Sequence, residues 1–265
     1  MMKIAFFDID GTLTSEKDGS VPDSAKSAIQ RARQAGNLMF INTGRCFQNV
    51  EERFREVGFD GYVNGCGTHI MIGNETLSYE SQPADRIHEL IDLSRKIDVD
   101  TLYECRYYVT FDPKHTLTHP DAIRQCQRFL DRNYDIAMDI DNPAFTCDKF
   151  VIWYREESQL NEIRKFTDKY YDCIDRGGTF REFVPKGYSK ATGLQKVLDY
   201  YNLPLDSAYA FGDSNNDLAM LSYVKHSVVM GNTESHELKV KAAHLAGKAS
   251  EDGLAKALSD LGFFE

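Results

Sequence analysis

The chain has 265 residues, 42% of them hydrophobic, so it can bury one large core or two modest ones. Its formal net charge of −10 disfavours a nucleic-acid backbone or an anionic membrane surface as the main partner. The six cysteines include no Cys-x-x-Cys pair, so the sequence predicts neither a zinc site nor a disulfide framework.

The N-terminal third alternates between strands and helices. Residues 3–9 form a mostly apolar run of the length expected of a buried strand. The elements expected after it are a helix, a strand, a helix, a strand and a hairpin, at 22–36, 37–42, 46–58, 61–63 and 68–79. This alternation, with polar or glycine-bearing strand ends, predicts an α/β protein with a Rossmann-like, doubly wound parallel sheet.

A second block begins at Pro83, and the first alternation resumes after it. The block's expected helices are 85–97, 121–133 and 158–170, and its expected strands are 102–111, 149–154, 171–175 and 179–184. Beyond it we expect helices at 189–201, 217–222, 235–243 and 253–261, and strands at 208–211 and 227–230. We therefore predict a catalytic core made of residues 1–82 and 187–265, with an inserted α+β cap domain at 83–186 that sets substrate specificity.

The sequence shows no membrane or export signal. No apolar segment approaches the ~20 residues of a membrane span. Asp8 and Asp10 interrupt the apolar run near the N-terminus, so it does not resemble the core of a signal peptide. Scattered thiols fit a reducing compartment, and we therefore expect a cytoplasmic protein.

Two carboxylates, Asp8 and Asp10, end the first expected strand and precede Gly11-Thr12. In an extended chain this spacing puts both side chains on one side, where like charges repel unless a cation or a shared proton lies between them. Gly11 allows a sharp turn whose backbone N–H groups can face an anion. An isolated Asp-x-Asp is better explained as part of an acidic surface, but its place at the end of a buried strand, followed by Gly-Thr, favours a function.

Three further polar stretches stand at strand ends or helix starts, where open α/β sheets bind their ligands. They are Thr43-Gly44-Arg45, Ser189-Lys190 and the run from Gly212 to Asp217. Taken singly, each has a simpler explanation: a helix cap and turn, a solvated lysine, and a capped turn. Taken together with Asp8 and Asp10, they supply the nucleophile, the acids and the phosphate-binding donors that phosphoryl transfer needs.

In order and residue type, these four stretches resemble the motifs of the haloacid dehalogenase-like superfamily. The matching segments are Phe7-Asp8-Ile9-Asp10-Gly11-Thr12, Ile41-Asn42-Thr43-Gly44-Arg45, Gly187-Tyr188-Ser189-Lys190 and Gly212-Asp213-Ser214-Asn215-Asn216-Asp217. The insertion between the second and third motifs, with Asn64-Gly65, is similar to the Cof-type subfamily with its class IIB cap. The resemblance implies a phosphoric monoester hydrolase that acts on small phosphorylated metabolites.

The resemblance also assigns roles to residues. It implies Asp8 as the nucleophile and Asp10 as the general acid and base. It implies Mg²⁺ held by Asp8, the Asp10 carbonyl and Asp213, with Asp217 completing the metal site by orienting metal-bound water. The phosphoryl oxygens would be bound by Thr43, Gly44, Lys190 and Asn216. Arg45 would bind the phosphate or the leaving group, although a surface salt bridge explains it as well.

The substrate and the outcome of the reaction stay open at this stage. Sugar phosphates are the usual substrates of the resembled family, a sugar phosphomutase like phosphomannomutase is the enzymatic alternative, and a non-enzymatic phospho-receiver is a more distant one. Candidate specificity residues in the cap are Tyr103, Arg106, Tyr108 and Trp153, whose aromatic members fit a hydrophobic core at least as well. The sequence does not indicate the oligomeric state.

Overall fold

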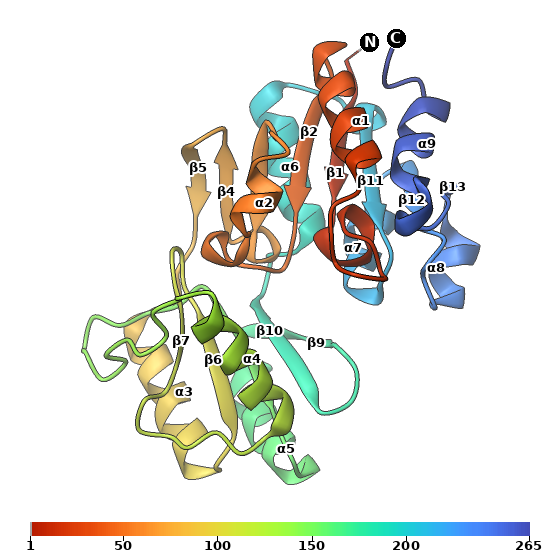
Figure 1. The fold of residues 1–265 in the computed structure, drawn as a ribbon. Helices are drawn as coiled ribbons and strands as arrows, with labels where there is room; N and C mark the ends of the chain where they lie inside the picture. The colour runs from red at the N-terminus through yellow and green to blue at the C-terminus, as the bar shows by residue number, and fades with distance from the viewer. Residues whose placement is uncertain (1) are drawn as a thin grey trace. The chain divides into compact units, whose positions relative to one another are not determined.

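The computed structural model describes residues 2–265 and divides the chain into two compact units (Figure 1). The first unit comprises the chain up to Gly44, then Val50–Ser78 and Tyr188–Glu265. The second comprises Arg45–Asn49 and Tyr79–Gly187. Among residues 2–265, no helix combines the length and the apolar composition that crossing a membrane requires.

The first unit is built on an eight-stranded sheet in the order β13-β12-β11-β1-β2-β3-β4-β5. The strands from β13 to β3 pair in parallel, and β4 pairs antiparallel to β3. Their bounds are β1 Ile4–Phe7, β2 Leu38–Asn42, β3 Gly61–Asn64, β4 His69–Ile72, β5 Glu75–Tyr79, β11 Ala208–Gly212, β12 His226–Val229 and β13 His244–Leu245. β1 is buried throughout and lies between β11 and β2, so the carboxyl ends of these three strands meet at one edge.

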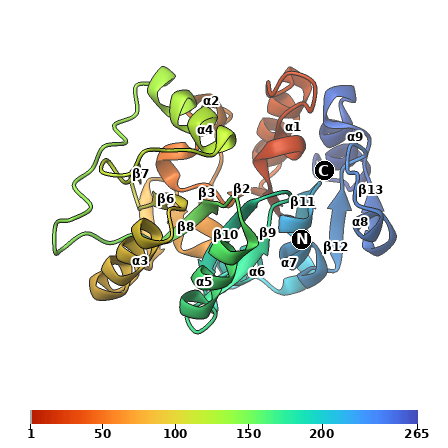
Figure 2. The same cartoon turned by 90° about the horizontal axis from the view of Figure 1, so that it is seen from below.

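Helices cover this sheet and bury their apolar stripes against it. They are α1 Asp23–Gln34, α2 Glu52–Arg55, α6 Lys190–Tyr201, α7 Leu218–Tyr223, α8 His236–Lys241 and α9 Gly253–Asp260. Phe6, Phe40 and Val63 of the sheet share one core cluster with residues of α6, α7 and α8. α1 and α9 lie side by side in both views (Figure 2). The predicted fold class, a doubly wound and mainly parallel core with a separate mixed α and β unit, is confirmed.

The second unit contains a five-stranded sheet in the order β7-β6-β8-β10-β9, paired antiparallel throughout. Its elements are α3 Ala84–Lys96, β6 Asp100–Glu104, β7 Val109–Phe111, α4 Pro120–Asp131, β8 Lys149–Trp153, α5 Glu157–Thr167, β9 Tyr171–Asp175 and β10 Phe180–Pro185. Side chains alternate between two cores, because successive strand residues face opposite sides. Phe150 and Ile152 pack with residues of α3 and α5, whereas Val151 and Trp153 pack with residues of α4.

Two expected elements were wrong in extent. The single strand expected at 102–111 is two strands, β6 and β7, because the chain reverses where the Cys105 amide donates to the Tyr108 carbonyl at 2.9 Å. The helix expected at 46–58 is reduced to one α-helical turn, α2, because Arg45–Asn49 belongs to the second unit and Glu51 has a non-helical ψ of 152°. Tyr103 and Trp153 are buried in the two cores of the second unit, as the alternative interpretation of these aromatics expected.

Candidate active site

The first acidic residue stands directly beyond the central strand. β1 ends at Phe7, and the Asp8 amide donates to the Phe211 carbonyl of the neighbouring β11 at 3.0 Å. The chain then makes one wide helical turn, Ile9–Leu13, within which Asp10 and Gly11 leave helical geometry. Asp8 is 4% exposed, whereas Asp10 lies on the exposed side of the turn. The two carboxylates therefore differ in environment, as two residues with different chemical roles would.

Gly11 is required at this turn for two reasons. Its φ of +73° lies in the left-handed region that side chains disfavour. A Cβ on Gly11 would also lie 2.1 Å from Oδ2 of Asp213, closer than any real contact. The turn thus places the backbone of Gly11 in close contact with the Asp213 carboxylate.

Replacing Gly11 with Ala should displace Asp213, lower Tm by several degrees and remove most of the phosphoryl-transfer activity that the sequence predicts. Gly19→Ala is the matched control, because Gly19 has a similar φ of +69° and a Cβ there would meet nothing within 4 Å. Its cost should be the backbone strain alone, about 1–2 kcal/mol, with activity kept. Thermal unfolding and a phosphate-release assay on both variants separate the steric clash with Asp213 from the backbone strain of a positive φ. Equal losses of activity in the two variants would show that the clash with Asp213 is not the cause.

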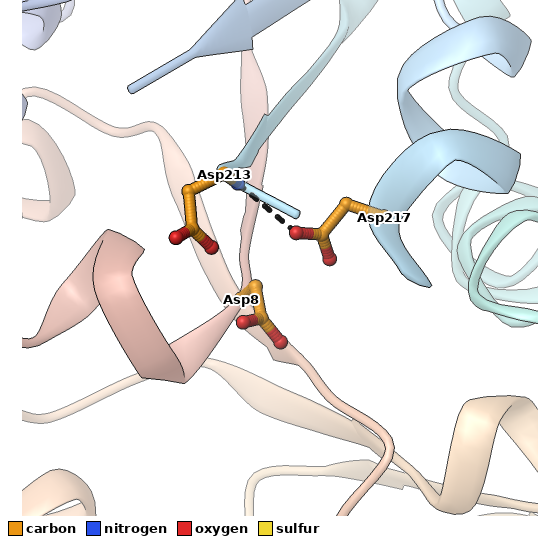
Figure 3. Close-up of side chains that lie close together, drawn as sticks. All are labelled: Asp8, Asp213 and Asp217. Carbon is orange, nitrogen blue, oxygen red and sulfur yellow. Dashed lines mark hydrogen bonds between the residues drawn. The ribbon is translucent and has the colours of Figure 1, made fainter. Parts of the chain in front are cut away.

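A second pair of acids follows β11. Asp213 comes directly after this strand, and Asp217 lies one turn further on, at the end of a short turn capped by Ser214. The Asp217 carboxylate folds back over this turn, and its Oδ2 accepts hydrogen bonds from the amides of Asp213 at 3.0 Å and Ser214 at 3.1 Å. Because β11 pairs with β1, these acids reach Asp8: each of the three residues offers an oxygen within 4.8 Å of the others (Figure 3).

Lys190 is the cation of this cluster. It opens α6 directly after the N-cap Ser189, and its side chain is 1% exposed. Its Nζ donates to Oδ1 of Asp8 at 2.5 Å and to Oδ1 of Asp217 at 2.6 Å. The side-chain amide of Asn42, at the end of β2, donates to the backbone carbonyl of Lys190 at 2.9 Å. This hydrogen bond fixes the start of α6 against the sheet.

Burial and crowding of like charges shape the ionisation of these groups. Burial raises the pKa of Asp8; Lys190 opposes this rise, while Asp217 and Asp10 add to it. Burial also raises the pKa of Asp213, to about 8, and the charges of Asp217 and Asp8 act in the same direction. Burial lowers the pKa of Lys190, but the two carboxylates outweigh it and hold the pKa above its ordinary value. The lysine stays charged, while the acids gain from any added positive charge.

The remaining predicted residues lie in different places. Thr43 is buried directly after β2, where its amide donates to the Val63 carbonyl at 2.8 Å. Gly44 ends the first unit's opening segment, and Arg45 belongs to the second unit, where Nη1 donates to the Asn49 carbonyl at 3.1 Å. Asn216 lies in the turn after Asp213 and accepts a hydrogen bond from the Ser214 hydroxyl. The structure thus gathers Asp8, Lys190, Asp213 and Asp217 into one cluster.

The sequence matches a known protein family over nearly its whole length. The family model of haloacid dehalogenase-like hydrolases matches residues 5–258. The chain belongs to this family. The hydrolase is 26% identical to the 5-amino-6-(5-phospho-D-ribitylamino)uracil phosphatase YitU of Bacillus subtilis, over 96% of this chain and 95% of YitU. The predicted enzyme class, a Cof-type phosphatase of the haloacid dehalogenase superfamily, is therefore confirmed.

Solved structures share the complete fold of this hydrolase. The phosphatase BT1666 of Bacteroides thetaiotaomicron is 25% identical, with a TM-score of 0.84 over 99% of this chain and 96% of that one. The sugar phosphatase BT4131, of subclass IIB of the superfamily, is 22% identical, with a TM-score of 0.81 over 99% of this chain and 100% of that one. The second likeness shows the fold, which includes the inserted unit.

The acidic cluster of this hydrolase fits a divalent cation. Its donors are carboxylate oxygens, which hard cations such as Mg²⁺ prefer. Oδ1 of Asp213 is buried and accepts no hydrogen bond, so a cation would satisfy it. Both oxygens of Asp217 already accept hydrogen bonds, from Lys190 and from the turn amides. Asp8 and Asp213 are therefore better placed than Asp217 for direct bonds to a metal.

Two further residues of the site, Asn42 and Asn232, have no role predicted from the sequence, although Asn42 lies within the second matching motif. Asn42 is the last residue of β2, and its side chain donates to the backbone carbonyl of Lys190. Asn232 follows the end of β12 and donates to both the Gly11 carbonyl and the Asp213 carboxylate. Both stand at or just beyond the carboxyl end of a parallel strand. The rule that located Asp8 and Asp213 would therefore have found them, had it been applied to amides as well as charged groups.

Proposed function

We propose that this hydrolase is a Mg²⁺-dependent phosphatase that cleaves sugar or sugar-alcohol phosphates through a phosphorylated Asp8. The observation that carries the proposal is the meeting of Asp8 with Lys190 and two further acids at one sheet edge. A buried carboxylate beside a charged lysine is suited to attack a phosphorus atom whose own negative charge must be offset.

The first step transfers the phosphoryl group to the enzyme. An oxygen of Asp8 attacks phosphorus in line, a new P–O bond forms, and the P–O bond to the leaving alcohol breaks. Asp10 gives its proton to the departing oxygen, which its exposed position allows. Bound Mg²⁺ would supply charge neutralisation between the anionic nucleophile and the phosphate, held by Asp8, Asp213 and the Asp10 carbonyl.

The second step returns the enzyme to its starting state. Asp10, now ionised, takes a proton from a water molecule, whose oxygen attacks phosphorus. The bond between phosphorus and Asp8 breaks, inorganic phosphate leaves, and Asp10 is again protonated. Lys190 stabilises the charge on the phosphoryl oxygens throughout, with Thr43, Gly44 and Asn216 as further donors. Asp217 holds Lys190 in position through its 2.6 Å contact, and it would orient water beside a bound metal.

The names of relatives support the substrate class. YitU is named for a substrate whose phosphate sits on a ribityl chain, and BT4131 is named a sugar phosphatase. Both names describe a phosphate on a polyhydroxylated carbon chain. We therefore place sugar and sugar-alcohol phosphates ahead of other phosphomonoesters.

The second unit, which contains the predicted cap at 83–186, is proposed to set specificity among these substrates by excluding water and contacting the leaving group. Arg45 and Arg106 are the cationic candidates for this contact. The Arg106 guanidinium lies over the rings of Tyr79 and Tyr107, 4.7 Å and 4.8 Å from their centroids, and these two contacts restrict its orientation.

A phosphate-release assay over a panel of sugar, sugar-alcohol and nucleoside phosphates, with and without Mg²⁺, tests the function. We expect metal-dependent release that is fastest for the polyol esters. Formation of an isomeric sugar phosphate would instead indicate a mutase, and a lasting acyl phosphate without release of inorganic phosphate would indicate a receiver.

Replacing residues 83–186 with a short linker should keep Mg²⁺ binding and abolish the order of preference among substrates. An unchanged order of preference would reject the cap assignment.

A further inference from the structure

The side-chain amide of Asn232 joins three loops around the acidic cluster. Its Nδ2 donates to the Gly11 carbonyl at 2.8 Å and to Oδ2 of Asp213 at 3.2 Å. Its Oδ1 accepts a hydrogen bond from the Ala249 amide at 3.2 Å. All three contacts require the same orientation of the amide, because only the nitrogen can donate and only the oxygen can accept.

These contacts place the two carboxylate oxygens of Asp213 in different environments. Oδ2 accepts from Asn232, whereas Oδ1 is buried and has no hydrogen-bond partner. A buried acceptor left without a partner is costly, so the arrangement is stable when something positive meets Oδ1. By holding Oδ2, the amide determines which oxygen of Asp213 faces the cluster.

The same amide fixes the turn that carries Asp10. Gly11, whose carbonyl accepts from Asn232, directly follows Asp10, and a Cβ at Gly11 would lie 2.1 Å from Oδ2 of Asp213, so the turn packs closely against this carboxylate. Glu16, just beyond the turn, accepts from the Ser250 amide at 3.1 Å and from the Ser250 hydroxyl at 2.5 Å. Asn232 and Glu16 therefore attach the turn to the loop at Ala249 and Ser250 at two points.

We infer that Asn232 is a positioning residue for the metal: it presents Oδ1 of Asp213 and the backbone of the Asp10 turn to Mg²⁺ without binding the ion itself. The inference rests on the proposed metal-dependent function. Groups that orient metal ligands in this way commonly account for a 10–100-fold difference in metal affinity.

Asn37 provides a matched control. It is a buried asparagine of the same unit, and its side chain also bridges distant segments, donating to the Phe263 carbonyl at 2.9 Å and accepting from the Lys3 amide at 2.9 Å. Both contacts lie at the amino end of the strands, opposite the acidic edge, because Lys3 directly precedes β1 and Asn37 directly precedes β2. Asn37→Ala therefore removes a comparable bridge without touching the site.

Calorimetric titration of Mg²⁺ alone into the metal-free full chain tests the inference. Asn232→Ala should weaken the Mg²⁺ Kd about tenfold or more, while Asn37→Ala should leave it within about twofold of wild type. Asn232→Ser, whose short hydroxyl cannot span both acceptors, should also weaken binding and serves if the alanine variant does not fold. Unchanged affinity in the Asn232 variants, or equal weakening by Asn37→Ala, would overturn the inference alone. A wild-type protein that binds no Mg²⁺ would overturn the proposed function with it.

Discussion

Asp8→Asn should lower kcat by about 10⁴-fold or more, because the amide cannot form the phosphorylated intermediate. The side chain would still fit its buried place between β1 and Lys190, so the loss would report chemistry and not folding. Asp60→Asn is a matched control in the same unit: Asp60 accepts from Arg33 and from the Met39 amide, contacts that are purely structural. It should keep activity within a few-fold of wild type.

Asp10→Asn should leave the nucleophile intact and remove only the proton transfers, which typically contribute 10²–10⁴-fold. The remaining reaction should therefore depend steeply on the leaving group. An aryl phosphate, whose phenolate leaves without a proton, should lose much less in phosphoryl transfer than an alkyl phosphate. Burst kinetics measure this step separately from hydrolysis of the intermediate. Equal losses for both substrates would assign Asp10 a role other than acid catalysis.

The convergence of Asp8 and Asp213 could be predicted from the sequence, although they stand at opposite ends of the chain. Each directly follows an apolar run, and parallel strands bring their carboxyl ends to one edge of a sheet. The position of Lys190 could also be predicted, because Ser189 is a strong helix cap and the next residue must open the helix at that edge.

Side-chain contacts within the cluster could not be predicted, because they depend on geometry that spacing does not encode. The sequence did not show that Asp217 would fold back onto the Asp213 and Ser214 amides, or that Asn232 would reach Gly11. The reversal at Cys105–Tyr108 was missed because Cys-Arg-Tyr-Tyr contains no residue typical of turns. The short α2 has a different cause: Cys46 packs into the core of the second unit, and tertiary contacts override helical periodicity.

The metal should also control stability, because the cluster holds excess negative charge. At the 4.8 Å that bounds the three acids, two carboxylate charges repel by roughly 3 kcal/mol at an effective dielectric near 20. Mg²⁺ binds the folded cluster and not the unfolded chain, so at 100 times its Kd it should add about 2.7 kcal/mol. For a chain of this size we expect Tm to rise by roughly 5–10 °C. Thermal unfolding over a Mg²⁺ series, with Ca²⁺-free buffer and EDTA as the baseline, measures this shift.

Asp8→Asn should reverse the order of stabilities with and without metal. The pKa of Asp8 is raised in the folded protein, so ionising it costs more there than in the unfolded chain, and the penalty grows as pH rises above the unfolded value near 4. Without metal at pH 8 the variant should therefore melt higher than wild type, and this advantage should shrink as the pH falls toward 4. The variant should gain less stability from Mg²⁺, because one metal ligand is lost.

Asp148→Asn is the control that separates the loss of a buried charge from the loss of a metal ligand. Asp148 is a buried acid of the second unit, and burial raises its pKa to about 7. That variant should also melt higher without metal, yet keep the full Mg²⁺ shift. If Asp8→Asn gained as much from Mg²⁺ as Asp148→Asn does, Asp8 would not be a metal ligand.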